Sequence, residues 1–243
     1  MLIKFRNNCG LSGFTEDYKN IRTFLIELNS PNYLFGRWDW MYTHLWLDKS
    51  GLSKIGIWED DKGIVSLATY DCELGKGYFC VKENYRHLLR EMLIYSQNSI
   101  SKNNEYMALI SDLDCEFQNI ASELGYIPTQ EKETDSVYPI ETENITYTIP
   151  DGFKVFSMND NYDIYKYGEV LWKGFNHELD GEGKYLPDEE KLTALNNEMK
   201  RPNVNLELKI VVSAPNGEFV SYCGMWQDDN SEIALVEPVA SRS

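Results

Sequence analysis

The side chains of this sequence that could do chemistry are mainly carboxylates, and several crowd the region between residues 178 and 190. Such a cluster could select a cationic acceptor substrate, because opposite charge raises the local concentration of an amine. Solvated charge on the flanks of helices explains the cluster as well or better. The carboxylates show no spacing typical of a glycosidase pair. The clustered acids are Glu178, Asp180, Glu182, Asp188, Glu189 and Glu190.

Histidine, cysteine and phosphate-loop chemistry has little support in the sequence. The three histidines are isolated, so neither a zinc site nor a Ser-His-Asp triad is expected. The five cysteines are odd in number and form no Cys-x-x-Cys pair, which favours reduced, mostly buried thiols in a cytoplasmic protein. Gly181-Glu-Gly183 lacks the preceding strand and the Lys-Ser/Thr of a phosphate-binding loop, so a mobile acidic loop over a substrate groove is expected there.

The composition indicates a folded, acidic protein. Apolar residues make up 42% of the 243 positions, and the formal net charge is −16. This charge argues against binding of nucleic acid or an anionic membrane, and it permits a cationic partner such as an amine. The segment Met1–Arg6 becomes polar too quickly for a signal peptide, and no apolar run approaches the length of a membrane span, so a cytoplasmic location is expected.

The elements that must position these residues can be predicted from periodicity. Thr15 caps a helix that ends at Asn29, and the aromatic stretch from Gly36 to Leu47 favours a second helix, although its tryptophans could also line a pocket. A strand meander, a helix, a short buried strand, a further helix and two closing strands should follow. Their expected ranges are 54–59, 64–70 and 77–81, then 84–99, 106–110, 114–124, and finally 126–128 with 136–140.

The same order then restarts after a polar linker at Glu141–Thr146. A strand at 153–156, helices at 160–175 and 188–199, and strands at 206–212, 218–227 and 232–236 are expected. The last strand should run into a Pro-Val-Ala turn, with no residues left for the elements that followed in the first copy. We therefore expect a mixed α/β (α+β) fold with mainly antiparallel sheet flanked by helices: one complete unit, residues 1–143, and the N-terminal half of a second, residues 144–243.

This pattern resembles the GNAT superfamily of N-acetyltransferases. In that fold an antiparallel meander leads into a splayed fourth strand, and the N-terminus of the next helix holds the pyrophosphate of acetyl-coenzyme A. The resemblance would place Cys80, Val81 and Arg86 beside the cofactor in the first unit. Leu89 and Glu91, however, occupy the positions of the family's glycines. Bulk and negative charge there would crowd and repel a pyrophosphate.

Two further family positions of the first unit also depart from the pattern. Asp114 stands where the family has Asn, and Ala121 stands at the position of the tyrosine that often serves as general acid. The spacing is counted back from Leu124-Gly125-Tyr126, which is similar to the family's Leu-Gly-Phe ending. The first unit is therefore expected to be a degenerate, non-catalytic copy.

In the second unit, Leu235–Ser241 resembles the fourth strand of the active half of tandem GNAT proteins. The resemblance implies that backbone groups of Val239 and Ala240, with Ser241 beside them, bind the pantetheine arm. Glu237 could accept a proton from a substrate ammonium through water, or it could be a structural acid at the end of a strand.

The expected activity is acetyl-coenzyme A-dependent acetylation of a primary amine of a small molecule or peptide. This chain is expected to be inactive, because its second unit, which fits the family pattern better, lacks the loop that binds the pyrophosphate. The rival interpretation is a non-catalytic module that holds a ligand or partner. No metal site is expected, and an open sheet edge could support a homo-oligomer.

Overall fold

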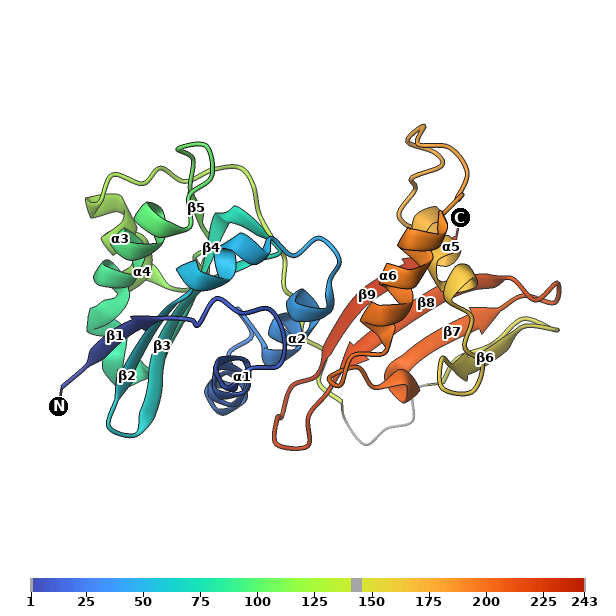
Figure 1. The fold of residues 1–243 in the computed structure, drawn as a ribbon, viewed down its shortest axis with the longest axis horizontal. Helices are drawn as coiled ribbons and strands as arrows, with labels where there is room; N and C mark the ends of the chain where they lie inside the picture. The colour runs from blue at the N-terminus through green and yellow to red at the C-terminus, as the bar shows by residue number, and fades with distance from the viewer. Residues whose placement is uncertain (1, 141–145, 243) are drawn as a thin grey trace. The chain divides into compact units, whose positions relative to one another are not determined.

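A five-stranded sheet with helices on both faces forms the first part of the chain (Figure 1). The computed structural model describes residues 2–140 and 146–242. Its sheet has the order β1-β2-β3-β4-β5, antiparallel except for a parallel β4–β5 pair. The strands are β1 (Lys4–Asn7), β2 (Gly56–Asp60), β3 (Gly63–Asp71), β4 (Glu73–Val81) and β5 (Met107–Ala108). The helices are α1 (Glu16–Leu28), α2 (Phe35–Thr43), α3 (Leu89–Ser99) and α4 (Cys115–Glu123), with short 3-10 turns η1 (Lys49–Lys54) and η2 (Glu83–Leu88).

Each face of this sheet buries its own hydrophobic cluster. α1 and α2 supply Ile21 and Trp38, which are fully buried in the same cluster as Leu67 of β3. On the other face, α3 and α4 supply Met92 and Phe117, which are buried in a cluster with strand residues such as Trp58 and Ala68. Trp38 and Tyr42 of the aromatic stretch after Gly36 therefore belong to the core, whereas Trp46 near its end is exposed.

The helix ends follow the capping signals in the sequence. The Thr15 side chain accepts a hydrogen bond from the Tyr18 N–H, and Asn29 ends α1 in the left-handed conformation. The Asp114 side chain caps α4 by accepting from the Phe117 N–H. α2 ends at Thr43, earlier than the predicted Leu47.

The second part of the chain folds around a four-stranded antiparallel sheet of order β6-β7-β8-β9. Its core includes Val170 of α5 together with Val211 and Tyr222 of the sheet. A boundary after Ser136 divides the chain into two units, with Asn230–Ile233 grouped with the first. The elements of the second unit are β6 (Lys154–Ser157), α5 (Ile164–Gly174), α6 (Glu189–Met199), η3 (Leu206–Leu208), β7 (Lys209–Ser213), β8 (Phe219–Trp226) and β9 (Leu235–Ser241).

The two units begin with the same order of elements. In each, a strand and two α-helices precede three strands, and the four strands lie side by side in chain order, all antiparallel. The first unit continues into η2, α3, β5 and α4. The predicted fold class, a mixed α/β fold with mainly antiparallel sheets flanked by helices, is confirmed.

Two predicted closing strands are wrong. Residues 126–140 form no strand, and side chains such as Ile127, Val137 and Ile140 are exposed. Pro128 and Pro139 each lack a backbone donor, which disfavours a sheet ladder, and acidic side chains between them favour water. The strand that extends the sheet on the β2 side is instead β1, which the sequence analysis did not predict.

Smaller differences concern the predicted strands at 106–110 and 232–236. The first is only two residues long and half-buried. The second begins at Leu235 and continues through Pro238, Val239 and Ala240, so the predicted Pro-Val-Ala turn is wrong. A proline can occur within β9 because β9 lies at the edge of the described sheet. Its missing N–H then affects the pairing with one neighbouring strand at most. The predicted linker Glu141–Thr146 lies outside the described residues, except for Thr146.

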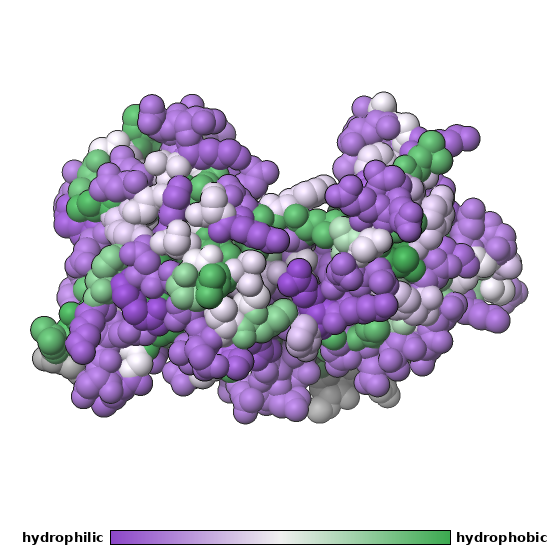
Figure 2. All heavy atoms as spheres, in the orientation of Figure 1, coloured by the Kyte–Doolittle hydropathy of each residue, from purple (hydrophilic) through white to green (hydrophobic). Residues whose placement is uncertain are grey.

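The visible surface is mainly hydrophilic. Hydrophilic residues cover most of the face shown in Figure 2, and hydrophobic residues appear there in small groups. Within residues 2–140 and 146–242, no helix combines the length and the apolar character needed to cross a bilayer.

Candidate functional site

The predicted cofactor strand, β9, has one paired edge and one edge without a neighbouring strand in the described part of the chain. The Arg242 N–H donates to the Val220 carbonyl at 2.9 Å, and the Ala240 carbonyl accepts from Ser221 Oγ at 3.2 Å. Backbone groups of successive residues in an antiparallel strand point to opposite sides. Ala240 therefore directs its backbone toward β8, whereas Val239 and Ser241 direct theirs toward the open edge.

Side chains on β9 follow the same alternation. Ala240 is buried, and Val239 and Ser241 are exposed. A Cβ atom added to Gly174 at the end of α5 would lie 2.7 Å from Ala240 Cβ and 2.9 Å from the Ser241 nitrogen. Glycine at this position therefore lets α5 lie directly against β9.

Glu237 lies where β9 bends against β8. Its carbonyl accepts a hydrogen bond from Trp226 Nε1 at 3.1 Å, and a Cβ on Gly224 would come within 2.7 Å of the same oxygen. The register shifts between Cys223 and Met225 at this point. The Glu237 side chain is half-buried, so its carboxylate is within reach of water.

In the first unit, β4 leaves its parallel neighbour after two paired residues. Lys76 and Gly77 pair with β5, and the Leu109 N–H donates to the Gly77 carbonyl at 3.0 Å. Beyond Gly77 the β5 side of β4 has no partner strand among the described residues. Val81 lies on this splayed part, and Cys80 is buried, which raises the pKa of its thiol.

Arg86, in the turn η2 that follows the splayed strand, is held by two carboxylates. Arg86 Nη2 lies 2.6 Å from Asp114 Oδ1, and Arg86 Nε lies 2.6 Å from Glu116 Oε2. Leu89 is buried, and Glu91 accepts a hydrogen bond from Trp58 Nε1 at 2.8 Å. The start of α3 therefore carries a packed leucine and a carboxylate, and the ion-paired acids of α4 lie beside it, where a phosphate-binding loop would need free donors and space.

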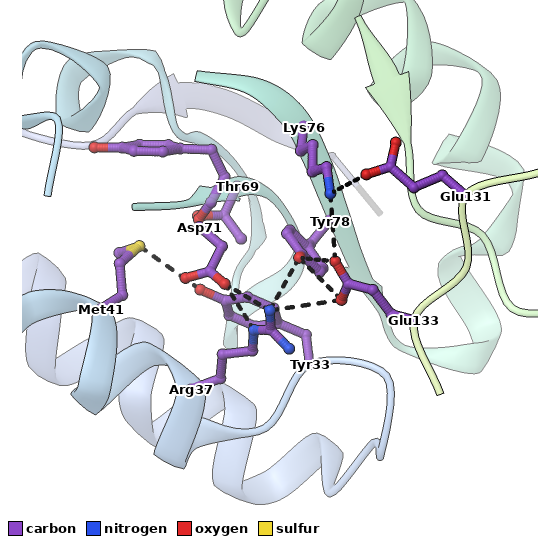
Figure 3. A network of polar contacts seen from close by, with 10 residues as sticks. Tyr33, Arg37, Met41, Thr69, Asp71, Lys76, Tyr78, Glu131 and Glu133 are labelled. Atoms are coloured by element: carbon purple, nitrogen blue, oxygen red, sulfur yellow. Dashed lines mark hydrogen bonds and ion pairs between the residues drawn. The ribbon is translucent and has the colours of Figure 1, made fainter. Parts of the chain in front are cut away.

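A polar network that the sequence analysis missed lies in the same unit, around the buried carboxylate of Asp71 (Figure 3). Arg37 of α2 donates from Nε to Asp71 Oδ2 at 2.8 Å, and its Nη2 lies 2.7 Å from the same oxygen. Asp71 Oδ1 is buried and accepts no hydrogen bond among the described residues. Burial raises the pKa of the Asp71 carboxyl, and Arg37 opposes this shift.

The network continues from Arg37 to the segment that was predicted to close the sheet. Arg37 Nη2 donates to Tyr78 Oη at 3.1 Å, and the Tyr78 hydroxyl donates to Glu133 at 3.2 Å. Lys76 Nζ lies 2.9 Å from Glu131 and 3.7 Å from Glu133. Figure 3 shows both glutamates reaching from this segment toward β4. The segment is thus tied to the sheet by side chains instead of backbone pairing.

Every charged group of this network lies beside a group of opposite charge. The network therefore serves to stabilise the fold. Burial raises the pKa of the Tyr78 phenol, which keeps it protonated and available as a donor. No local pattern links Arg37 with Asp71, 34 positions later, because one residue lies on a helix and the other at the end of a strand. Within the described residues, no cluster of three His, Cys, Asp or Glu side chains could hold a metal ion.

Comparisons with known proteins add distant structural likenesses only. No protein-family model and no curated protein matches the chain. A solved structure described as a GCN5-related N-acetyltransferase from Sphaerobacter thermophilus is similar, with 13% sequence identity and a TM-score of 0.47. The alignment covers 99% of this chain and 76% of that chain. Because proteins this different can share a fold without sharing chemistry, function has to be argued from the residues of the site.

Proposed function

We propose that this chain is part of an acetyl-coenzyme A-dependent N-acetyltransferase that acts on a primary amine of a small molecule or peptide. The observation that carries the proposal is the open edge of β9, where Val239 and Ser241 direct backbone donors and acceptors away from β8. The pantetheine arm of coenzyme A contains two amides, and an amide chain can bind an open strand edge as an added strand does.

The order of elements supports the same proposal. Both units begin with a strand, two helices and a three-stranded meander, which is the order on which the GNAT resemblance rests. The splay of β4 from β5 after Gly77 is the feature that the resemblance requires of a fourth strand. We therefore propose two GNAT-like units in tandem.

In this proposal the reaction is a direct attack. The acceptor ammonium loses a proton through water to Glu237, whose side chain is half-buried at the bend of β9. The neutral amine attacks the thioester carbonyl carbon, and backbone N–H groups along the edge stabilise the oxygen that gains negative charge. The carbon–sulfur bond then breaks, and the nitrogen gives its second proton to the departing thiolate, which leaves a neutral amide and the coenzyme A thiol.

The first unit has a non-catalytic role in this proposal. Asp114 and Glu116 hold Arg86, and Glu91 lies on the first turn of α3. A pyrophosphate would have to displace these carboxylates or lie among them, against Coulomb repulsion. This arrangement also favours the second candidate, a GNAT-like module that binds a ligand or partner without catalysis.

The test compares the two edges of the second sheet. Val239→Pro removes an N–H that points to the open edge of β9 without removing a bond to β8. Val155→Pro is the matched control on β6, the opposite edge strand. Its N–H also points outward, because the Met158 N–H donates to the Lys209 carbonyl and positions alternate.

Acetyl-coenzyme A is titrated calorimetrically into both variants and the unchanged protein. We expect binding that weakens by about tenfold or more in Val239→Pro and is unchanged in Val155→Pro, consistent with loss of one hydrogen bond in a desolvated contact. Equal binding by both variants contradicts the role of β9. Absence of binding by the unchanged protein supports the non-catalytic module.

A further inference from the structure

An aromatic cluster lies between α5 and the loop that follows it, within the second unit. Trp172 of α5 stacks on His177 with ring centroids 4.4 Å apart and planes inclined by 22°. Tyr185, at the end of the loop, lies 6.1 Å from Trp172 and 5.3 Å from Tyr165, centroid to centroid. Trp172 Nε1 donates to the Gly183 carbonyl at 3.0 Å, which fixes the indole relative to the loop.

Tyr185 is held firmly in this cluster. Its side chain is buried, and a Cβ atom on Gly168 of α5 would lie only 1.9 Å from Tyr185 Oη. Glycine at position 168 therefore makes the space into which the phenol ring fits. The Tyr185 ring and the Trp172 indole are therefore both held in place by the surrounding chain.

An ammonium group already lies on these rings. Lys191 Nζ of α6 lies 4.7 Å from the centroid of the Trp172 ring and 5.7 Å from that of Tyr185. Both distances fall within the range in which a cation is attracted to the face of an aromatic ring. Lys191 makes no ion pair with any described carboxylate, although Glu189 and Glu190 precede it directly. Its ammonium therefore lies against the rings and not against the nearby acids.

The charge around the cluster favours cations. Glu182 contacts His177 Nδ1 at 2.6 Å, and the loop carries further acids at positions 178, 180 and 188. Negative charge around a site raises the local concentration of a cationic ligand. Lys191 itself is an exposed side chain, so water can replace the rings as its surroundings when it leaves.

We propose that Trp172 and Tyr185, bordered by His177, form a binding site for an organic ammonium group, and that the Lys191 ammonium is its internal occupant. A primary, secondary or methylated ammonium of a ligand would displace Lys191 and take its place on the rings. The site does not depend on acetyl transfer, and it would serve a non-catalytic binding module equally well.

The experiment removes the internal occupant. Lys191→Met keeps a long unbranched side chain without the charge, and Lys200→Met makes the same change of charge just beyond α6, at a side chain outside the cluster. Tetramethylammonium is the probe, and tert-butanol is its uncharged counterpart of similar shape. Binding is followed by the indole N–H resonance of Trp172 in two-dimensional NMR spectra, assigned with Trp172→Phe.

We expect Lys191→Met to bind tetramethylammonium about tenfold more tightly than the unchanged protein, because a competing occupant lowers the apparent affinity by the fraction of time that it fills the site. Lys200→Met should bind as the unchanged protein does, and tert-butanol should not shift the resonance. Equal affinities of Lys191→Met and Lys200→Met, or an equal response to tert-butanol, would overturn the proposal.

Discussion

Arg37 Nη2 lies 2.7 Å from Asp71 Oδ2, so a residue of helix α2 forms an ion pair with the buried carboxylate at the end of β3. Burial raises the pKa of Asp71, and the guanidinium of Arg37 counteracts this effect. A carboxyl with a raised pKa in the folded state binds its proton more tightly when folded. The contribution of this carboxyl to the free energy of unfolding therefore falls as the pH rises from the pKa of the unfolded state, about 3.9, through the higher pKa of the folded state.

Arg37→Met should enlarge that effect. The loss of unfolding free energy relative to the unchanged protein should grow as the pH rises from about 4 to about 7. It should reach on the order of 2 kcal/mol, below the usual cost of breaking a fully buried pair because the Arg37 side chain is 22% exposed. Urea unfolding at a series of pH values measures this. In Arg37→Met/Asp71→Asn, which lacks the buried carboxylate, the loss should no longer grow with pH as it does in Arg37→Met, and an equal growth in both variants would contradict this account.

Glu133 should hold the segment that follows α4. Glu133→Gln removes the charge that faces Lys76 and Arg37 and should release the segment, at a cost of about 1 kcal/mol because the pairs are partly exposed. Trypsin cleavage after Lys132 should then become several-fold faster, since cleavage follows the population of the open segment. Glu131→Gln loses only the pair with Lys76 and should have a smaller effect. Equal cleavage rates in all three proteins would show that Glu133 does not anchor the segment.

Gly174 should be needed for the packing of α5 against β9. Glycine to alanine in a helix usually stabilises a protein by about 0.5–1 kcal/mol. Here the new Cβ would lie 2.7 Å from Ala240 Cβ, so Gly174→Ala should lower the melting temperature instead. Gly174→Ala/Ala240→Gly removes one of the two short contacts and should recover part of the loss. A melting temperature that is unchanged or higher in Gly174→Ala would mean that α5 and β9 are not in this contact.

The five cysteines should differ in reactivity. Cys9 and Cys115 are exposed, whereas Cys80 is buried, which raises the pKa of its thiol. Because the thiolate is the reactive form, a thiol reagent such as 5,5′-dithiobis(2-nitrobenzoic acid) should modify Cys115 rapidly and Cys80 only after unfolding. Mass spectrometry of digested protein, sampled over time, identifies the modified sites. Rapid modification of Cys80 in the folded protein would contradict its burial.

The sequence predicted those elements whose signals are local. The cap at Thr15 and the apolar residues at helical spacing after it correctly indicated α1, and the predicted ranges 114–124 and 188–199 correctly located α4 and α6. The hairpin between β2 and β3 was predicted from its turn at 60–63. These features depend on residues close together in the chain.

Features that depend on distant partners were not predicted. The segment 126–140 has apolar residues that suggest strands, but no ladder partner for them exists in the described sheet, and Glu133 ties it to Tyr78 instead. β1 is short and charged, and it is a strand because Phe5 lies opposite Trp58 of β2. The cation site of Trp172 and Lys191 requires α5, its loop and α6 to meet, which periodicity does not reveal.

The most direct measurement follows the backbone amides of β9 by NMR while acetyl-coenzyme A is added. The proposed function requires the N–H groups of Val239 and Ser241, which point away from β8, to shift with the ligand and to become protected from hydrogen exchange. The Ala240 N–H, directed toward β8, should change much less. Saturable shifts confined to residues outside β9, or equal shifts at all three amides, would contradict the account.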